Sequence, residues 1–250
     1  PLGDLPTPAV ARSFGERLFA AVFKDEVRVC LHSSLDAAGR QGEGLRIRLR
    51  LADAPELAGL PWEYLYSPTL SRSLVLSTET PLVRYLELPE RIQPLAVTPP
   101  LRVLVMISSP ADYPRLNVEQ EWTRLREALC DLELSGRVAL ERLEAATLTA
   151  LQRQIRQADC HVLHFIGHGA FDETAQDGVL VMQDDAGQGR LVSGQYLGTI
   201  LHDHKPLRLA VLNACQGAAV SRADPFAGTA QGLVRQGIPA VIAMQYAITD

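Results

Sequence analysis

A cysteine and a histidine follow two of the most apolar stretches of this sequence. Cys215 comes shortly after the run Leu207 to Leu212, and His168 comes shortly after the run Cys160 to Ile166. Continuous apolar runs are typical of parallel strands that are covered on both faces, and reacting groups collect at the carboxyl ends of such strands. His168 lies about 50 residues before Cys215. Two strand ends are therefore expected to present an imidazole and a thiol.

A thiol and an imidazole suit nucleophilic catalysis at a carbonyl group. Peptide hydrolysis by a thiol needs a cysteine that forms a thiolate and an imidazole that gives a proton to the leaving amine. It also needs hydrogen-bond donors for the tetrahedral oxyanion. Free cysteine is often simply a small buried apolar residue, which is our expectation for Cys30, Cys130 and Cys160. The same inert interpretation stays open for Cys215.

Two groups of residues could be interpreted as metal ligands instead. The histidines His161, His164 and His168 with Cys160 have a tolerable zinc spacing on a helix, but the segment has the pattern of a strand, where 161 and 164 face opposite sides. We therefore expect no metal and interpret His164 as an ordered structural imidazole. Four acidic residues could bind calcium but lack the order of a calcium-binding loop, so a solvated loop is expected: Asp172, Asp177, Asp184 and Asp185.

Composition narrows the class of protein. The 250 residues are 47% hydrophobic with a net charge of −5, so the chain can bury a sizeable core and offers no basic surface for nucleic acid. No apolar stretch is long enough to cross a membrane and no signal-peptide pattern opens the chain, so we expect a soluble, cytoplasmic protein. The widely spaced cysteines predict reduced thiols. No phosphate-binding glycine motif follows any strand, and no cofactor is expected.

The second part of the chain alternates strands with helices. This alternation predicts an α/β fold with a mainly parallel sheet flanked by helices. The expected strands are 101–107, 138–143, 160–166, 178–183, 207–212 and 240–246, and the expected helices are 117–132, 147–158, 193–201 and 225–236.

The first part of the chain has a different pattern. A helix over Ala9 to Phe23 is predicted to lead into a strand over Glu26 to Leu31. Leu45 to Leu51 alternates strictly between apolar residues and arginine, which favours an antiparallel strand with one solvated face over an anion-binding patch. A β-rich run over Ser73 to Leu88 and a proline-rich segment, Pro89 to Pro100, follow. We therefore expect a β-rich α+β region over 1–95 and a separate domain over 100–250.

Three segments resemble the CHAT domain, a caspase- and separase-like family of prokaryotic cysteine peptidases. They are HFIGHG around His168, LNACQG around Cys215, and GIPAVIAMQ from Gly237 onward. Earlier segments, LRIRL and LPWEYLY, are similar to the β-rich region that often precedes that domain. The resemblance implies a caspase-like fold and a cysteine endopeptidase that cuts a protein substrate within a regulated bacterial signalling or defence system. A catalytically silent scaffold of the same fold for protein binding is the alternative.

The resemblance also implies roles for individual residues. Cys215 is the expected nucleophile and His168 the general acid and base, with the backbone amides of Gly169 and Cys215 forming the oxyanion hole. Asn213, two residues before the nucleophile, is expected to line the pocket for the substrate residue before the scissile bond. Because its amide is neutral, we expect a neutral residue there.

The last apolar strand, Ala240 to Tyr246, carries an expectation about partners. CHAT domains usually continue beyond this strand with a further helix, whereas four residues follow it here. A strand this apolar needs cover on both faces, and leaving three such side chains in water would forgo roughly 1.5 to 3 kcal/mol each. We therefore expect a partner chain or a separated second fragment to pack beside this strand, with no nucleic acid and no membrane among the partners.

Overall fold

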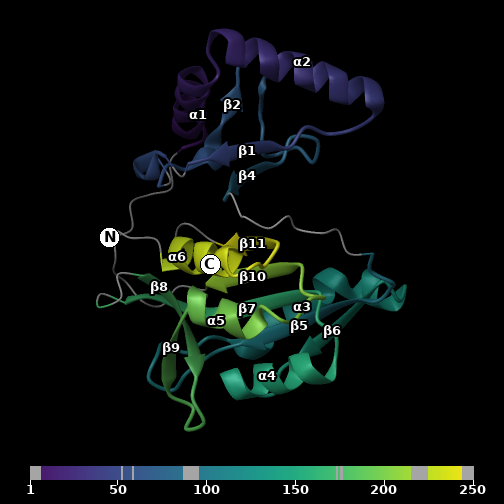
Figure 1. Ribbon diagram of the computed structural model, residues 1–250, viewed down its shortest axis with the longest axis vertical. Coiled ribbons are helices and arrows are strands. Elements are labelled where there is room, and N and C mark those ends of the chain that lie inside the picture. The colour runs from purple at the N-terminus through teal and green to yellow at the C-terminus, as the bar shows by residue number, and fades with distance from the viewer. Residues whose placement is uncertain are drawn as a thin grey trace. The chain divides into compact units, whose positions relative to one another are not determined.

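The chain forms two compact units, Pro1–Glu87 and Leu88–Asp250 (Figure 1). The computed structural model describes residues 7–51, 53–57, 59–86, 96–172, 174, 177–214 and 225–243.

The first unit combines two helices with two small sheets. The helices are α1 (Pro8–Val22) and α2 (Asp25–Gln41), and the parallel pair of strands is β1 (Ile47–Arg50) and β4 (Leu82–Tyr85). The antiparallel pair is β2 (Tyr66–Ser67) and β3 (Arg72–Ser73), and two 3₁₀ turns cover Pro55–Leu57 and Trp62–Tyr64. Buried side chains, among them Phe19, Trp62, Leu65 and Leu74, give this unit its own core.

Two expectations for this unit are wrong. Glu26 to Leu31 is the start of helix α2 and not a strand, because Leu31 and Leu35 at helical spacing face the core while Val27 and Val29 stay exposed. Asp25 and Glu26 also suit the positive end of a helix.

Strand β1 runs parallel to β4, and not antiparallel to a neighbour as expected. Its solvated face is confirmed, because Arg48 and Arg50 are exposed and the Arg48 guanidinium lies 4.9 Å from the centre of the Tyr85 ring. In a sheet of two strands one face can be solvated whatever the direction of pairing. The alternation therefore carried information about burial and none about direction.

The second unit is built on one sheet. Within the described residues it has seven strands, with β11, β10, β7, β5 and β6 side by side in parallel and the antiparallel strands β8 and β9 extending β7. The strands are β5 (Leu101–Ile107), β6 (Val138–Arg142), β7 (Val162–Asp172), β8 (Asp177–Gln183), β9 (Gly189–Ser193), β10 (Leu209–Ala214) and β11 (Ala240–Ala243). The helices are α3 (Val118–Leu134), α4 (Leu148–Gln157), α5 (Gly194–Leu201) and α6 (Pro225–Arg235). The expected α/β fold with a mainly parallel sheet and flanking helices is confirmed.

Local signals begin three of these helices. Asn117, Thr147 and Ser193 each accept a hydrogen bond from the backbone amide three residues later, which satisfies a donor that the helix itself cannot. The end of the expected strand 240–246 lies outside the described residues.

The helices cover the two faces of the sheet unequally. Helices α4, α5 and α6 pack on one face through buried leucines, including Leu151, Leu197 and Leu233. Helix α3 packs on the other face, with Trp122 among its contacts. Strand β7 serves both cores by alternation: Leu163 and Phe165 face the first, and Val162 and Ile166 face the second.

Three parallel strands reach the same edge of the sheet. Ile107 at the end of β5 pairs with Ile166 of β7, and Ala214 at the end of β10 pairs with Gly167 of β7. Strands β5 and β10 therefore end on either side of β7, directly before His168. This arrangement positions the candidate site.

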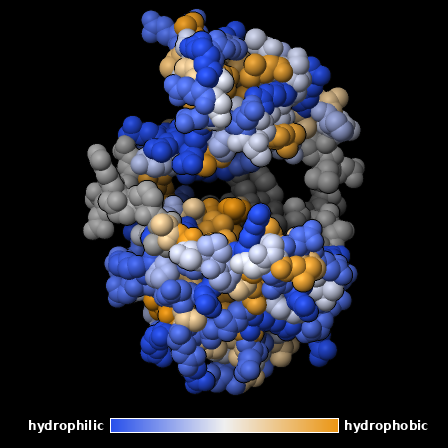
Figure 2. All heavy atoms as spheres, turned by 90° about the vertical axis from the view of Figure 1, so that its right-hand side faces the viewer, coloured by the Kyte–Doolittle hydropathy of each residue, from blue (hydrophilic) through white to orange (hydrophobic). Residues whose placement is uncertain are grey.

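The surface of each unit is mostly hydrophilic on the face that Figure 2 shows. Strand β11 is the outermost described strand on its side of the sheet, and its Ile242 side chain is 59% exposed. The expectation of a partner beside this strand stays a prediction. In the part of the chain that the structure describes, every helix is too short or too polar to cross a membrane.

Candidate functional site

His168 lies at the point where β7 leaves the parallel sheet. Up to Gly167 the strand pairs with β10, and from His168 to Asp172 it pairs with β8 in antiparallel register. The expectation that a strand ends at His168 is therefore wrong. Because β8 supplies new backbone partners, the chain stays extended after the parallel neighbours end. The histidine is consequently 1% exposed and held inside a strand.

One ring nitrogen of His168 has a defined partner. Nε2 lies 2.8 Å from the carbonyl oxygen of Pro114. A carbonyl oxygen can only accept, so Nε2 is the donor, and in the neutral form of the ring the lone pair lies at Nδ1. Nδ1 is buried and has no hydrogen-bond partner among the described residues. A buried nitrogen without a partner costs about 1 to 3 kcal/mol, so this one calls for an explanation.

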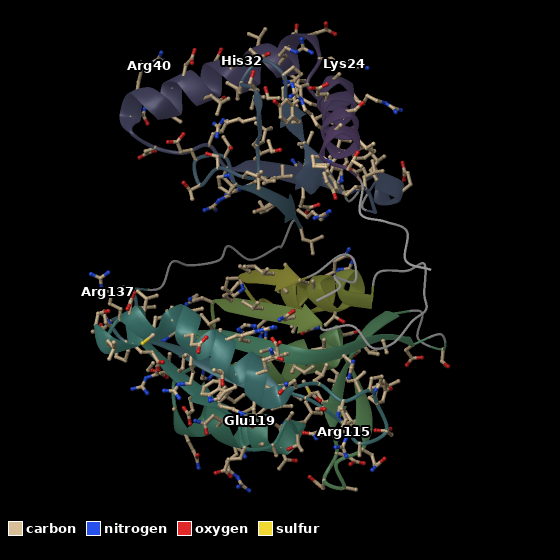
Figure 3. The ribbon with its side chains drawn as sticks, turned by 180° about the vertical axis from the view of Figure 1, so that it is seen from behind. Lys24, His32, Arg40, Arg115, Glu119 and Arg137 are labelled. Atoms are coloured by element: carbon tan, nitrogen blue, oxygen red, sulfur yellow. The ribbon has the colours of Figure 1, made fainter. Side chains whose placement is uncertain are left out.

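The partner carbonyl belongs to the segment between β5 and α3. In this segment, residues 108–117, the ring of Tyr113 stacks on the His168 imidazole with centroids 5.6 Å apart and planes inclined by 26°. Arg115, the residue after Pro114, is exposed (Figure 3). Tyr113 and Pro114, which are consecutive in this loop, thus contact the ring plane and the ring edge of His168, respectively.

The same loop is fastened to the turn between β8 and β9. Ala111 N donates to Gly187 O at 3.0 Å, and Gly189 N donates to Asp112 Oδ1 at 2.7 Å. At its base, the buried hydroxyl of Ser108 donates to Val181 O at 2.8 Å. The position of the loop over His168 therefore depends on the β8–β9 hairpin.

Glycine at 189 has a steric reason. A Cβ there would lie 2.4 Å from Cε2 of Tyr113. Gly167 has a comparable reason, because its Cβ would lie 2.5 Å from the Phe165 ring and 3.2 Å from Ser108 Cβ. Both glycines let neighbouring elements approach closely beside His168.

The other half of the predicted site follows β10. Asn213, half buried, is the residue paired with Ile166, and Ala214 pairs with Gly167. Cys215 follows Ala214 in the chain and lies outside the described residues, so its side chain and its amide stay predictions. Gly169 is half buried and pairs with Leu180 of β8. The structure therefore brings together Asn213, near the end of β10, and His168 and Gly169, which lie in β7 where its pairing passes from β10 to β8.

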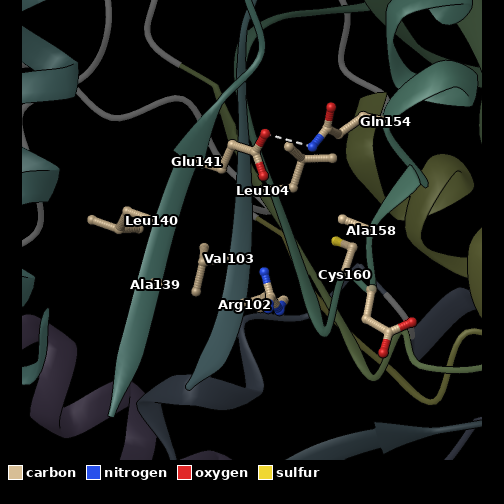
Figure 4. Close-up of a pocket in the computed structure, with 10 residues that line it drawn as sticks. Arg102, Val103, Leu104, Ala139, Leu140, Glu141, Gln154, Ala158 and Cys160 are labelled. Carbon is tan, nitrogen blue, oxygen red and sulfur yellow. Dashed lines mark hydrogen bonds between the residues drawn. The ribbon is translucent and has the colours of Figure 1, made fainter. Parts of the chain in front are cut away.

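Cys160 lies at the opposite, amino-terminal end of the strands. It is 4% exposed beside a cavity of about 200 Å³ between α4, β5 and β6, where Gln154 donates to Glu141 (Figure 4). Burial raises the pKa of its thiol to about 12, which keeps the thiol protonated. The inert interpretation of this cysteine agrees with its burial. Cys30 and Cys130 are exposed and not buried as expected, because each lies on the outer side of a helix.

The histidines near Cys160 have structural partners. Nδ1 of His161 accepts the amide of Arg102 at 2.9 Å, and Nε2 of His204 accepts the amide of Cys160 at 2.9 Å. His164 is different: Nε2 is buried without a described partner, and burial lowers its pKa. Among the described residues, no three His, Cys, Asp or Glu side chains are arranged to hold a metal ion.

Two of the acidic residues stabilise turns. Asp184 Oδ1 accepts the amides of Ala186 and Gln188 at 2.9 and 2.8 Å in the β8–β9 turn, and Asp172 Oδ1 accepts the amide of Thr174 at 2.9 Å. These carboxylates form local turns that are typical of Asx motifs.

Sequence reasoning missed Tyr113 and Pro114. A signal was present, because the segment after β5 also leaves the carboxyl end of a parallel strand, where functional loops gather. It contains one tyrosine but no cysteine or histidine, so nothing in its residue types singled it out.

Comparison with known families gives a match over nearly the whole chain. The model of the CHAT domain matches residues 12–250, which cover most of the first unit, all of the second, and the His168 and Cys215 segments. No curated protein matches the chain. The fold, with its mainly parallel sheet and flanking helices, agrees with the family match. The chain belongs to the CHAT domain family, which is related to the caspase-like cysteine peptidases.

Proposed function

We propose that this protein is a cysteine endopeptidase that cuts a protein substrate with a dyad of His168 and Cys215. The observation that carries the proposal is the hydrogen bonding of the two ring nitrogens of His168. Its Nε2 donates a hydrogen bond to the Pro114 carbonyl, and its Nδ1 is buried without a partner among the described residues. A catalytic base needs one free nitrogen. His164 also has a buried ring nitrogen without a described partner, but His168 alone of the two comes directly after the Gly167–Ala214 pair that precedes Cys215 in the sequence.

The pairing of β7 with β10 supports the identity of the thiol. Gly167 and Ala214 are direct partners, and His168 and Cys215 are the next residues of the two strands' sequences. The described end of β10 therefore lies beside β7 at the residue before His168. We propose that the Cys215 thiol exchanges its proton with Nδ1 of His168 from there.

In the proposed reaction, the Cys215 thiol gives its proton to Nδ1 of His168 and the thiolate attacks the scissile carbonyl carbon. The tetrahedral intermediate collapses as the imidazolium returns the proton to the leaving amine, which leaves an acyl-enzyme that water then hydrolyses. The Pro114 carbonyl accepts the hydrogen bond from Nε2–H throughout the reaction and so stabilises the imidazolium. The amides of Gly169 and Cys215 are the proposed donors to the oxyanion, and Asn213 lines the proposed pocket.

Comparison of cleavage in a proteome tests this proposal. Lysate of the source cell is incubated with the wild type and with Cys215→Ala, and new amino termini are identified by mass spectrometry. Termini that depend on Cys215 support a peptidase. Identical sets of termini, together with lysate proteins that bind equally to both forms, would favour the silent scaffold instead.

A further inference from the structure

The orientation of the His168 ring depends on more than its hydrogen bond. Rotation of a histidine about χ2 is broad and roughly two-fold, so a half turn exchanges Nδ1 for a carbon atom. The hydrogen bond from Nε2 to Pro114 opposes that turn but does not by itself fix the plane of the ring. Tyr113 lies against this plane, with the ring centroids 5.6 Å apart. The two contacts together define where Nδ1 points.

Tyr113 is in turn held by the β8–β9 hairpin. The residues before it, Ala111 and Asp112, are hydrogen-bonded to Gly187 and Gly189 of the turn. Its ring occupies the space that a Cβ of residue 189 would need, with Cε2 only 2.4 Å from that position. Nothing in the proposed chemistry requires glycine at 189, yet any larger residue there would displace the tyrosine.

We infer that Tyr113 is a positioning residue that holds the His168 imidazole for proton transfer, and that the β8–β9 hairpin acts on the site through Gly189. This inference rests on the proposed peptidase function for its kinetic consequences. Its structural part, the fixed orientation and tautomer of His168, can be measured without turnover.

Three variants and two controls separate the role of the ring from general stability. Tyr113→Leu removes the aromatic face, and Tyr113→Phe keeps it. Gly189→Ala leaves the tyrosine in the chain but forces its ring away from Gly189. Gly39→Ala is the matched control for the added methyl group, because a Cβ at 39 meets no atom within 4 Å. Tyr196→Leu is the matched control for the lost ring, because Tyr196 is a half-exposed tyrosine on α5.

The first measurement is nuclear magnetic resonance of protein labelled with ¹⁵N in histidine. The His168 signals are assigned by their loss in His168→Gln. We expect a single tautomer protonated at Nε2 in the wild type, Tyr113→Phe and both controls, and a mixture of tautomers in Tyr113→Leu and Gly189→Ala. An unchanged single tautomer in the last two variants would overturn the inference.

The second measurement is steady-state kinetics on a cleaved peptide. Because a displacement of about 1 Å in a reacting group can cost ~10²-fold, we expect kcat to fall roughly 10- to 100-fold in Tyr113→Leu and Gly189→Ala with KM changed less than about twofold. Tyr113→Phe should restore most of kcat. The double variant Tyr113→Leu/Gly189→Ala should be no worse than the poorer single variant, because both changes break one contact. Fully multiplicative losses would contradict the coupling.

The two measurements distinguish a failure of the proposed peptidase function from a failure of the positioning role of Tyr113. A wild type that cleaves nothing but shows the tautomer change would reject the proposed function and keep the positioning role. Cleavage that depends on Cys215 but is indifferent to Tyr113 and Gly189 would keep the proposed function and reject this inference.

Discussion

Ala214 of β10 pairs directly with Gly167 of β7, so each residue of the proposed dyad comes next after one member of the same pair. The relationship joins two segments that are far apart in sequence. It arises because the two strands are parallel and β10 ends beside Gly167 of β7, with Ile107 at the end of β5 on the other side of β7 through its pairing with Ile166. The dyad is therefore proposed from the register of the sheet as well as from residue types.

The first prediction concerns the two side chains of the dyad. Cys215→Ala and His168→Gln should each lower kcat/KM by at least ~10³-fold, since the thiol and the imidazole act as a unit. Glutamine is the better replacement because its Nε2 can still donate to the Pro114 carbonyl. Cleavage of a peptide substrate gives the activity, and circular dichroism confirms the fold of each variant. Wild-type turnover in either variant would reject the dyad.

His168→Ala should behave differently from His168→Gln. The histidine is 1% exposed and packed under Tyr113, so alanine leaves a cavity and should cost stability as well as activity. Urea unfolding measures this loss, which we expect to be on the order of 1 to 3 kcal/mol. Equal stability of the alanine and glutamine variants would show that the packing contributes little.

The second prediction concerns specificity. Asn213 is half buried at the end of β10 and presents a neutral amide. Profiling with a peptide library should show neutral residues before the scissile bond, and Asn213→Asp should shift the preference toward Arg and Lys because a carboxylate supplies a counter-charge. Asn213→Gln is the control that keeps the neutral amide. A strong preference of the wild type for Arg or Lys would exclude Asn213 as the determinant.

The third prediction concerns the reactivity of the described cysteines. Burial raises the pKa of Cys160 to about 12, whereas Cys30 and Cys130 are exposed. At pH 8 the thiolate fraction of Cys160 should be about 10³-fold smaller than that of an ordinary exposed cysteine. Alkylation by iodoacetamide, followed by mass spectrometry, should therefore modify Cys160 last. In urea the order should disappear, and equal rates in the folded protein would contradict the burial of this thiol.

The fourth prediction concerns stability and pH. Burial lowers the pKa of His204, whose Nε2 accepts the Cys160 amide, and burial also lowers the pKa of His164. A histidine with a lowered folded pKa stabilises the protein above its unfolded pKa of about 6.5, and this contribution is lost as pH falls through the folded value. The urea concentration at the unfolding midpoint should therefore decrease as the pH is lowered from 7.5 to 5.5. His204→Gln, which can still accept the amide, should reduce the fall, and an unchanged pH dependence would exclude His204 as a cause.

The sequence predicted the second unit better than the first. Long apolar runs that alternate with helical segments predicted strands and helices close to those of the structure, because burial on both faces leaves a strong local pattern. The prediction of a strand over Glu26 to Leu31 was wrong because six residues with two exposed valines fit both the two-residue period of a strand and the 3.6-residue period of a helix. The packing of Leu31 and Leu35 against the core stabilises the helix.

The candidate site was predictable in part for a related reason. His168 and Cys215 carry reactive groups and follow apolar runs, so their types and positions single them out. The continuation of β7 beyond His168 was not predictable, since it depends on pairing with β8, whose residues follow a polar segment. Tyr113 and Pro114 act through a ring face and a backbone carbonyl, and neither function has a signature in residue type.

Covalent labelling by a peptide electrophile tests the central claim most directly. A short peptide with a neutral residue before an acyloxymethyl ketone is incubated with the wild type and with His168→Gln, and the modified residue and its rate are found by mass spectrometry. The account predicts that Cys215 of the wild type is labelled at least ~100-fold faster than Cys30 or Cys130, and that the advantage is lost in His168→Gln. Labelling of Cys215 no faster than the exposed cysteines, or equally fast without His168, would contradict the account.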